Sequence, residues 1–159
     1  MSINEDQFYI RLGRTKFLHC YQSLCETFPI AGHSQRGPSR DEIVRALKTL
    51  GRELKRDPRD GSFTRSDLIR ECEITSGFVF QRHGLLECYF FWKSPVPSLA
   101  SHFSGIGYEL RSRLKVPQSD PPYPRPAYVG VSRLGEMLTG WDELDRISRG
   151  ACGMRGAQQ

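Results

Sequence analysis

Residues 74–84, "ITSGFVFQRHG", decide which fold the sequence predicts. Small turn-forming residues open the stretch, a Phe-Val-Phe run follows, and a polar, partly basic end closes it. Thr75 or Ser76 can cap a helix, because a hydroxyl at that position accepts a main-chain N–H that the helix leaves free. We therefore predict a short helix after a tight turn, with an inner face in the core and an outer face that could contact another molecule.

The segment before it carries a helical pattern. A plausible capping box pairs Ser39 with Glu42, three residues later, and Pro58 ends the helix that follows. The apolar face of this predicted helix consists of Ile43, Leu47, Leu50 and Leu54. Thr64 and Asp67 repeat the capping signal before a second, short helix. The two helices and the one after the turn give a helix-turn-helix layout over residues 40–92.

Helical periodicity also dominates the rest of the chain. Apolar faces recur within residues 14–28, 98–116 and 131–150, whereas "ECYFFW" (87–92) and "AYVGV" (127–131) are the two candidate strands. Residues 116–128 hold five prolines and read as an extended arm. We predict a mainly α fold: a small helical domain with a helix-turn-helix-like corner, a Pro-rich arm and a C-terminal helix.

This pattern divides the chain into six predicted parts. They are an N-terminal helix and linker (1–38), the helix-turn-helix-like module (39–92), a packing helix (93–115), the Pro-rich arm (116–130), the C-terminal helix (131–150) and a flexible tail (151–159).

The predicted module resembles the homing-endonuclease-associated repeat, a short helical DNA-binding module. The likeness rests on "RDEIVRALKTLGRELKRDP" (40–58) and "FTRSDLIRECEITSGFVFQRHG" (63–84). The chain departs from the family pattern at His83, at Leu86 and in the "CYFFWK" that follows, and it carries one copy of a unit that normally occurs in tandem. The resemblance implies a helix-turn-helix-like fold that contacts duplex DNA.

The resemblance also implies a register for the last helix. Val79, His83 and Leu86 would face the module core, while the opposite side would offer Gln81 to adenine and Arg82 to guanine or a phosphate. The alternative is that Phe78 and Phe80 are both core residues and the helix is buried on two sides. The predicted DNA-binding residues are Ser76, Gly77, Phe78, Gln81, Arg82, Arg65, Arg56, Arg111, Arg113 and Lys115.

Composition sets the class of the protein. The net charge is +5, the sequence pI is about 9.1, and most basic residues are arginine, which suits phosphate and guanine contacts. No apolar run is long enough to span a membrane, and the start lacks a secretory signal. The five cysteines show no compact pairing, so we expect reduced thiols in a cytoplasmic protein, associated with the nucleoid if the host is bacterial.

No catalytic motif, metal site or cofactor motif can be read. Cys20 and Cys25 are five residues apart, a spacing that would not converge on one metal ion from a helix. We therefore expect no enzyme, no cofactor, no metal and no small-molecule substrate. The first functional hypothesis is a non-catalytic accessory or regulatory protein of a bacterium, phage or mobile element. It would bind double-stranded DNA alone or within a larger nucleoprotein complex.

The second functional hypothesis is a protein-interaction subunit. Such an adaptor would dock through its aromatic cluster and its Pro-rich arm without reading DNA directly. Its predicted partner-binding residues are Trp92, Tyr123 and Trp141.

Overall fold

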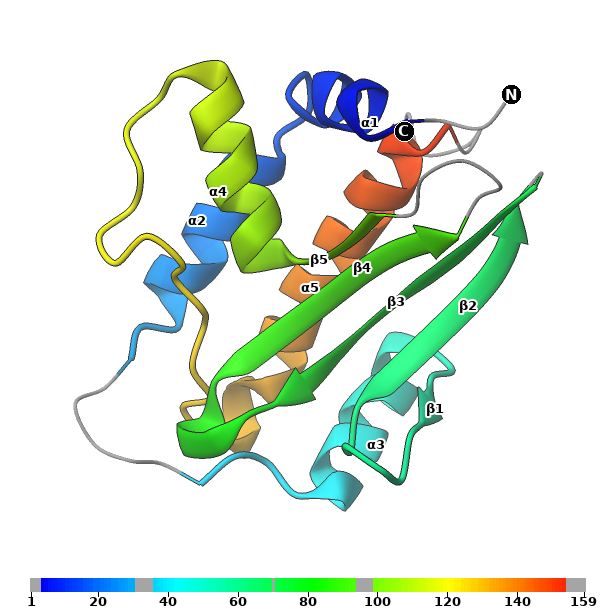
Figure 1. Ribbon diagram of the computed structural model, residues 1–159. Helices are drawn as coiled ribbons and strands as arrows, with labels where there is room; N and C mark the ends of the chain where they lie inside the picture. Colours follow the sequence, from blue (N-terminus) through cyan, green and yellow to red (C-terminus); the bar gives the residue numbers. More distant parts are fainter. Residues whose placement is uncertain (1–3, 31–35, 70, 94–98, 154–159) are drawn as a thin grey trace.

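The chain folds into one antiparallel sheet with helices packed on one of its faces. The computed structural model describes residues 4–30, 36–69, 71–93 and 99–153. Five strands follow one another in the order β1-β2-β3-β4-β5, and every neighbouring pair is antiparallel. Helix α5 passes behind the strands in Figure 1, and no labelled helix lies in front of them. The result is a two-layer α+β architecture with one open sheet face.

The prediction of a mainly α fold is wrong, because the segment expected to form the helix-turn-helix corner forms strands. The strands are β1 (Lys55–Arg56), β2 (Phe63–Ile69), β3 (Cys72–Phe80), β4 (Leu86–Lys93) and β5 (Leu99–His102). In β3 the side chains alternate, and Ile74, Ser76 and Phe78 point into the protein. This period of two, which is typical of a strand, competes with the helical spacing of Val79, His83 and Leu86.

The end of the opening stretch is a turn. Residues Arg82–Gly84 form a 3-10 turn between β3 and β4, and His83 (φ 66°) and Gly84 (φ 75°) both have left-handed backbone. Gln81 N–H donates to the Leu85 carbonyl with 2.7 Å between N and O, which closes the hairpin. A glycine at the second left-handed position lets the chain reverse there without a Cβ clash.

The helices agree better with the sequence. They are α1 (Glu5–Leu12), α2 (Phe17–Thr27), α3 (Arg40–Leu50), α4 (Phe103–Leu114) and α5 (Leu134–Ala151), with a 3-10 turn at Val131–Arg133. The predicted capping box is present, since Ser39 and Glu42 exchange side-chain and main-chain hydrogen bonds at the start of α3. No helix in the described ranges is long and apolar enough to cross a membrane.

Aromatic side chains join the two layers. Trp141 of α5 meets Phe78 of β3 edge to face, with 5.0 Å between ring centroids. Phe8 of α1 packs against Trp92 of β4 at 4.9 Å. All four side chains are at most 1% exposed, so the core lies between the helices and one face of the sheet.

The Pro-rich arm packs along the molecule and contributes a single bridge to the sheet. The main chain of the arm forms hydrogen bonds with β4 and with the end of α2. Leu86 N donates to the Pro126 carbonyl, and Ala127 N donates to the Phe28 carbonyl. The predicted strand at 127–131 does not form; one isolated bridge links Leu85 and Ala127. The tail beyond residue 153 lies outside the described residues.

Candidate binding surface on the open face of the sheet

Strand β4 divides its aromatic cluster between the two faces of the sheet. Phe90 and Trp92 are buried under the helices, whereas Tyr89 and Phe91 are only partly buried and point to the opposite face. Successive side chains of a strand must point to opposite faces, so "CYFFW" cannot act as one patch. Two aromatic rings therefore remain on the face that no described helix covers.

One cross-strand row spans all five strands on this open face. The register pairs Lys55 with Thr64, Thr64 with Gly77, Gly77 with Tyr89, and Tyr89 with His102. The rings of Tyr89 and His102 are 5.0 Å apart between centroids and tilted by 54°. The row thus places an aromatic pair on β4 and β5 and a cation on β1, with small residues between them.

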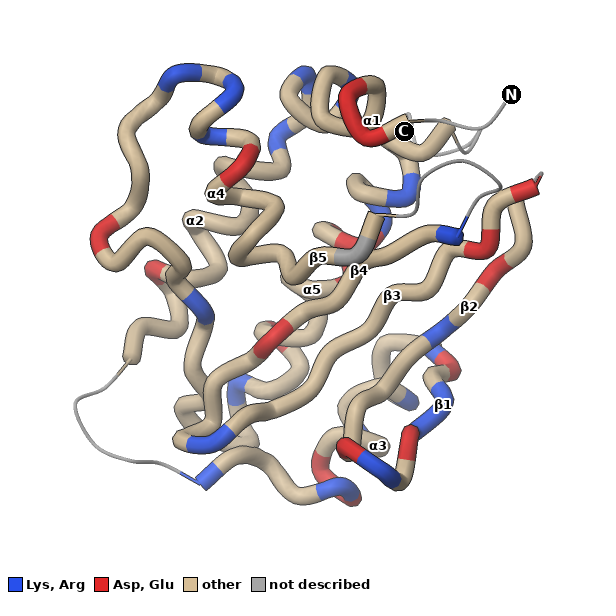
Figure 2. The backbone as a smooth tube through the Cα atoms, viewed as in Figure 1, with Lys and Arg blue, Asp and Glu red and all other residues tan. Residues whose placement is uncertain are grey.

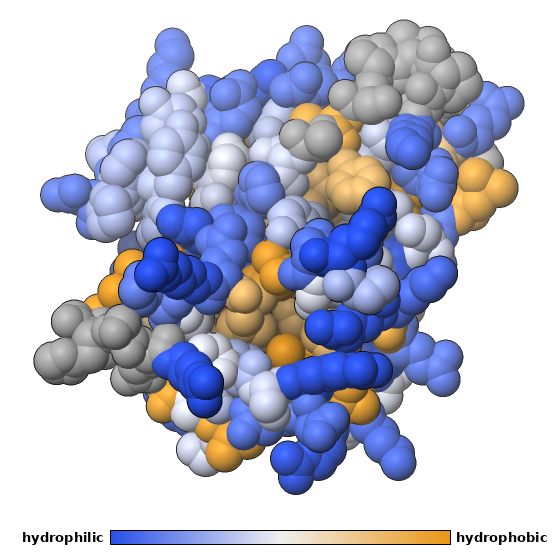
Figure 3. All heavy atoms as spheres, turned by 60° about the horizontal axis from the view of Figure 1, so that its bottom comes forward, coloured by the Kyte–Doolittle hydropathy of each residue, from blue (hydrophilic) through white to orange (hydrophobic). Residues whose placement is uncertain are grey.

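A second row runs beside the first. It pairs Ser66 with Thr75 and Thr75 with Phe91, and the hydroxyls of Ser66 and Thr75 are 2.7 Å apart. Short hydroxyl side chains on β2 and β3 therefore lie beside the taller rings of β4. With the lower end of the molecule turned forward, Figure 3 shows apolar side chains at the surface between rows of hydrophilic ones.

Glycine is required in the middle of the first row. A Cβ at Gly77 would overlap the main-chain carbonyl oxygen of Phe63 and would lie 2.8 Å from the Thr64 Cα. The close approach of β2 and β3 at this point excludes any side chain. The row therefore has no side chain between Thr64 and Tyr89, and the Gly77 main chain is itself buried.

The β1–β2 hairpin adds a basic hollow at one end of this face. It has a volume of about 390 Å³ and is lined by Lys55, Arg56, Asp57, Pro58, Arg59 and Thr64. The side chain of Arg59 donates to the Asp57 carboxylate and lowers the pKa of that group to about 2. Lys55 and Arg56 form no ion pair in the part of the chain that the structure describes. The basic and acidic segments of this hairpin are visible in Figure 2.

The DNA-binding residues predicted from the sequence do not gather on one surface. Ser76 and Phe78 are buried toward the helices, and Gly77 lies on the open face. Gln81, at the start of the β3–β4 turn, accepts a hydrogen bond from Arg125 of the Pro-rich arm. Arg82, in the same turn, is exposed. The others are in the hollow (Arg56), in a charged cluster beside α5 (Arg65) and at the end of α4 (Arg111, Arg113, Lys115).

The predicted partner-binding residues also separate. Trp92 and Trp141 are 1% and 0% exposed, so neither offers a surface to a partner. Tyr123 is half exposed on the arm and stacks on Tyr108 of α4, with 4.7 Å between ring centroids.

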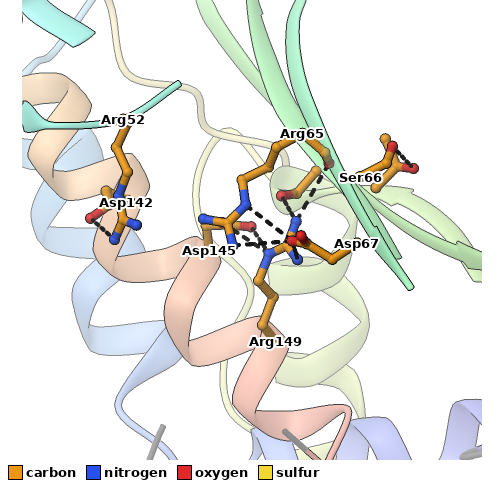
Figure 4. Close-up of polar contacts among 9 residues, drawn as sticks. Arg52, Arg65, Ser66, Asp67, Asp142, Asp145 and Arg149 are labelled. Atoms are coloured by element: carbon orange, nitrogen blue, oxygen red, sulfur yellow. Dashed lines mark hydrogen bonds and ion pairs between the residues drawn. The ribbon is translucent and has the colours of Figure 1, made fainter. Parts of the chain in front are cut away.

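A charged cluster that the sequence analysis missed joins α5 to the sheet (Figure 4). Arg149 is 3% exposed and contacts Asp145 (Nε–Oδ2, 3.2 Å), Asp67 (Nη1–Oδ2, 2.6 Å) and the Ser76 hydroxyl (2.7 Å). Arg65 pairs with Asp67 at 3.1 Å. Burial raises the pKa of Asp145, and the charge of Arg149 opposes that rise. Every charged member has a partner, which indicates a structural role.

Sequence reasoning missed the open-face residues for one reason. Residues 87–92 were a candidate strand and form β4, but their aromatic residues were treated as one docking cluster, so the alternation that separates Tyr89 and Phe91 from Phe90 and Trp92 was not used. Within the described ranges, no group of His, Cys, Asp or Glu side chains could hold a metal ion. Comparison of the chain with protein-family models, with curated proteins and with solved structures finds no match.

Proposed function

We propose that the chain is a non-catalytic nucleic-acid-binding protein that holds single-stranded nucleic acid on the open face of its sheet. The observation that carries the proposal is the row from Lys55 through Gly77 to Tyr89 and His102. It combines a cation, a position without a side chain and two adjacent rings on one face. Proteins that bind single strands use the same combination of a basic track and stacking aromatics.

The rings would bind bases. Tyr89 and Phe91 are two residues apart on β4, which separates them by about 6.8 Å along the strand. Two bases could therefore stack on neighbouring rings while the hydroxyls of Ser66 and Thr75 remain beside them. Stacking of a base on an aromatic side chain is worth about 1–3 kcal/mol and tolerates any base sequence.

The hairpin hollow would bind the backbone. Lys55 and Arg56 carry charges that no described carboxylate pairs with, so an incoming phosphate would not have to displace a salt bridge. Each phosphate neutralised on a single strand contributes about −0.7 to the slope of log K against log salt. Two such contacts predict a slope of about −1.4.

Single strands fit this face better than the duplex DNA expected from the sequence. The major groove admits an α-helix or a two-stranded ribbon, and a five-stranded sheet is too broad to enter it. The segment that the sequence predicted to form the groove-reading helix forms strand β3 and the turn that follows it. We therefore place the proposed nucleic-acid contact on the open sheet face instead of on a reading helix, and the proposed ligand is a single strand instead of a duplex.

The test is fluorescence anisotropy with labelled single-stranded DNA and RNA of about 12 nucleotides and with the matching duplex. We expect salt-dependent binding of a single strand that is tighter than binding of the duplex. Replacing Tyr89 or Phe91 by Ala should weaken it by about 5- to 150-fold. Tyr123→Ala, which removes a half-exposed ring elsewhere, is the matched control and should bind as the parent does.

Two results would overturn the proposal. One is the absence of binding at about 50 mM salt by a chain whose circular dichroism shows it to be folded. The other is equal loss of affinity in Tyr123→Ala and Tyr89→Ala. Lys55→Gln adds an independent check, because it should make the salt slope shallower by about 0.7 and leave base stacking intact.

A further inference from the structure

A second hollow lies between α2, α4 and the Pro-rich arm. Its volume is about 650 Å³, within the usual range of about 300–1,000 Å³ for sites that bind small molecules. Its wall includes Leu18, Tyr21 and Cys25 of α2, Gly107 and Arg111 of α4, and prolines of the arm. Most of this wall is apolar or aromatic.

The arm forms a fixed wall of this hollow. The Tyr21 hydroxyl donates to the Pro124 carbonyl at 2.6 Å, which ties the arm to α2. The Gln118 amide donates to the Tyr108 carbonyl at 3.0 Å, and Tyr123 stacks on Tyr108, which ties the arm to α4. The hollow therefore exists because the arm is held at both ends, and it is partly preformed for a ligand.

Arg111 is the polar group that distinguishes this wall. Its guanidinium donates to the Pro117 carbonyl and to the Gln22 side-chain oxygen, both at 3.1 Å. It forms no ion pair with any carboxylate in the described part of the chain. Arg113, one half-turn further along α4, differs because it pairs with Asp6 at 2.9 Å and with Glu109 at 2.8 Å.

The remaining charged groups of the wall do not cancel this cation. Arg125 pairs with the buried carboxylate of Glu87 at 3.2 Å. The Glu26 carboxylate accepts the Gln22 amide N–H, so the amide separates it from Arg111. Asp120 is exposed on the arm, where water and salt screen its charge. Burial raises the pKa of Cys25 to about 12, so that part of the wall is uncharged at neutral pH.

We propose that this hollow binds a small amphiphilic anion, with an apolar or aromatic body against α2 and the arm and a carboxylate on Arg111. A carboxylate can bond the fork of a guanidinium at two points and would replace neutral carbonyl and amide acceptors by a charged one. The site has its own wall residues, and its proposal does not depend on the proposed nucleic-acid surface. It also departs from the expectation of no small-molecule ligand.

The experiment titrates the chain with 3-phenylpropionate and with 3-phenylpropan-1-ol, which has the same body without the charge. Isothermal calorimetry should show saturable binding of the anion and at least about tenfold weaker binding of the alcohol, the size expected for a hydrogen bond to a charged group. Arg111→Gln should reduce affinity for the anion to that for the alcohol. Arg113→Gln, on the same helix, should leave both affinities unchanged.

Amide chemical shifts locate the ligand. Changes confined to α2, α4 and the arm support the proposal. Equal affinity for the alcohol and the anion would overturn it, as would an unchanged affinity in a folded Arg111→Gln variant. The titration extends to about 10 mM anion, a concentration above the dissociation constants of weak ligand sites. Absence of saturable binding over that range would overturn the proposal as well.

Discussion

Arg149 of α5 and Asp67 of β2 form an ion pair with 2.6 Å between Nη1 and Oδ2, although 82 residues separate them in the chain. Arg149 also reaches Asp145 on its own helix and Ser76 on β3. A guanidinium whose donors each have a partner accepts few alternative geometries. The pair therefore fixes how α5 is rotated and placed along the sheet.

Removing this guanidinium should destabilise the fold. Arg149→Met leaves Asp145, which is 1% exposed, without its main counter-charge. Loss of one partner of a buried ion pair typically costs about 3–5 kcal/mol, and we expect a loss in that range in urea unfolding at pH 7. Lys16→Met is the control, because its exposed pair with Glu143 should be worth less than about 1 kcal/mol. Equal losses in the two variants would contradict the role given to Arg149.

Gly77 should tolerate no side chain. Alanine there would press its Cβ into the main chain of β2, so we expect Gly77→Ala to lose on the order of 3 kcal/mol of stability. Gly135 in α5 has open space around its Cα, and Gly135→Ala should be neutral or stabilising by up to about 1 kcal/mol. Thermal unfolding of the pair of variants measures both effects. A Gly77→Ala protein as stable as the parent would show that β2 and β3 do not approach so closely.

Both tryptophans should report a buried environment. Trp92 and Trp141 are at most 1% exposed, and their indole N–H groups have no hydrogen-bond partner in the described structure. We expect blue-shifted emission that resists quenching by acrylamide and shifts to the red on unfolding. Trp141→Ala should cost about 3–5 kcal/mol of stability because it empties the contact with Phe78. Ready quenching in the native state would place a tryptophan at the surface after all.

Stability should decrease at alkaline pH. Burial raises the pKa values of Cys25 and Cys152 to about 12, so the folded chain keeps these protons longer than the unfolded chain does. Their contribution is complete below the ordinary thiol value of 9.0 and is lost as the pH rises toward 12. Each thiol can contribute a slope of up to about 1.4 kcal/mol per pH unit in that window. Urea unfolding in reductant should show a shallower decline in Cys152→Ala than in the parent.

The hydroxyl of Tyr21 should matter for the arm more than for the core. Tyr21→Phe removes the 2.6 Å bond to the Pro124 carbonyl and keeps the ring that packs under α4. We expect a loss of about 1 kcal/mol in global stability and faster protease cleavage within residues 117–125. An unchanged cleavage rate would show that the other contacts of the arm hold it alone.

The helices were predictable because their signals are redundant. In α5 the predicted apolar face (Leu134, Met137, Leu138, Trp141, Leu144 and Ile147) is buried throughout. In α3 the capping box and the apolar residues Ile43, Leu47 and Leu50 agree on a helix, but the helix ends at Leu50 before a left-handed Gly51, so Leu54 and the predicted end at Pro58 lie outside it. Each signal is local, so no tertiary contact had to be known.

The strands were not predictable in the same way. Residues 63–69 carry a capping signal at Thr64 and Asp67, and yet Thr64 belongs to the sheet surface and Asp67 to the buried ion pair. Residues 74–80 contain cap and turn formers, which disguise the alternation of Ile74, Ser76 and Phe78. Cross-strand partners 3 to 20 residues away decide such short segments, and neither composition nor spacing reveals them. The open-face surface depends on that register and was missed with it.

Helix α5 follows all five strands in the chain and yet covers the face of the sheet that carries Phe78 and Trp92. During synthesis at about 5–20 residues per second, the last strand, which ends at His102, is made about 2.5–10 s before α5 is complete at Ala151. For that interval the part of this face around Phe78 lacks the contact with Trp141 of α5, whereas α1, which is made first, can already cover Trp92. The order of the elements thus leaves the part of the core around Phe78 to be closed last.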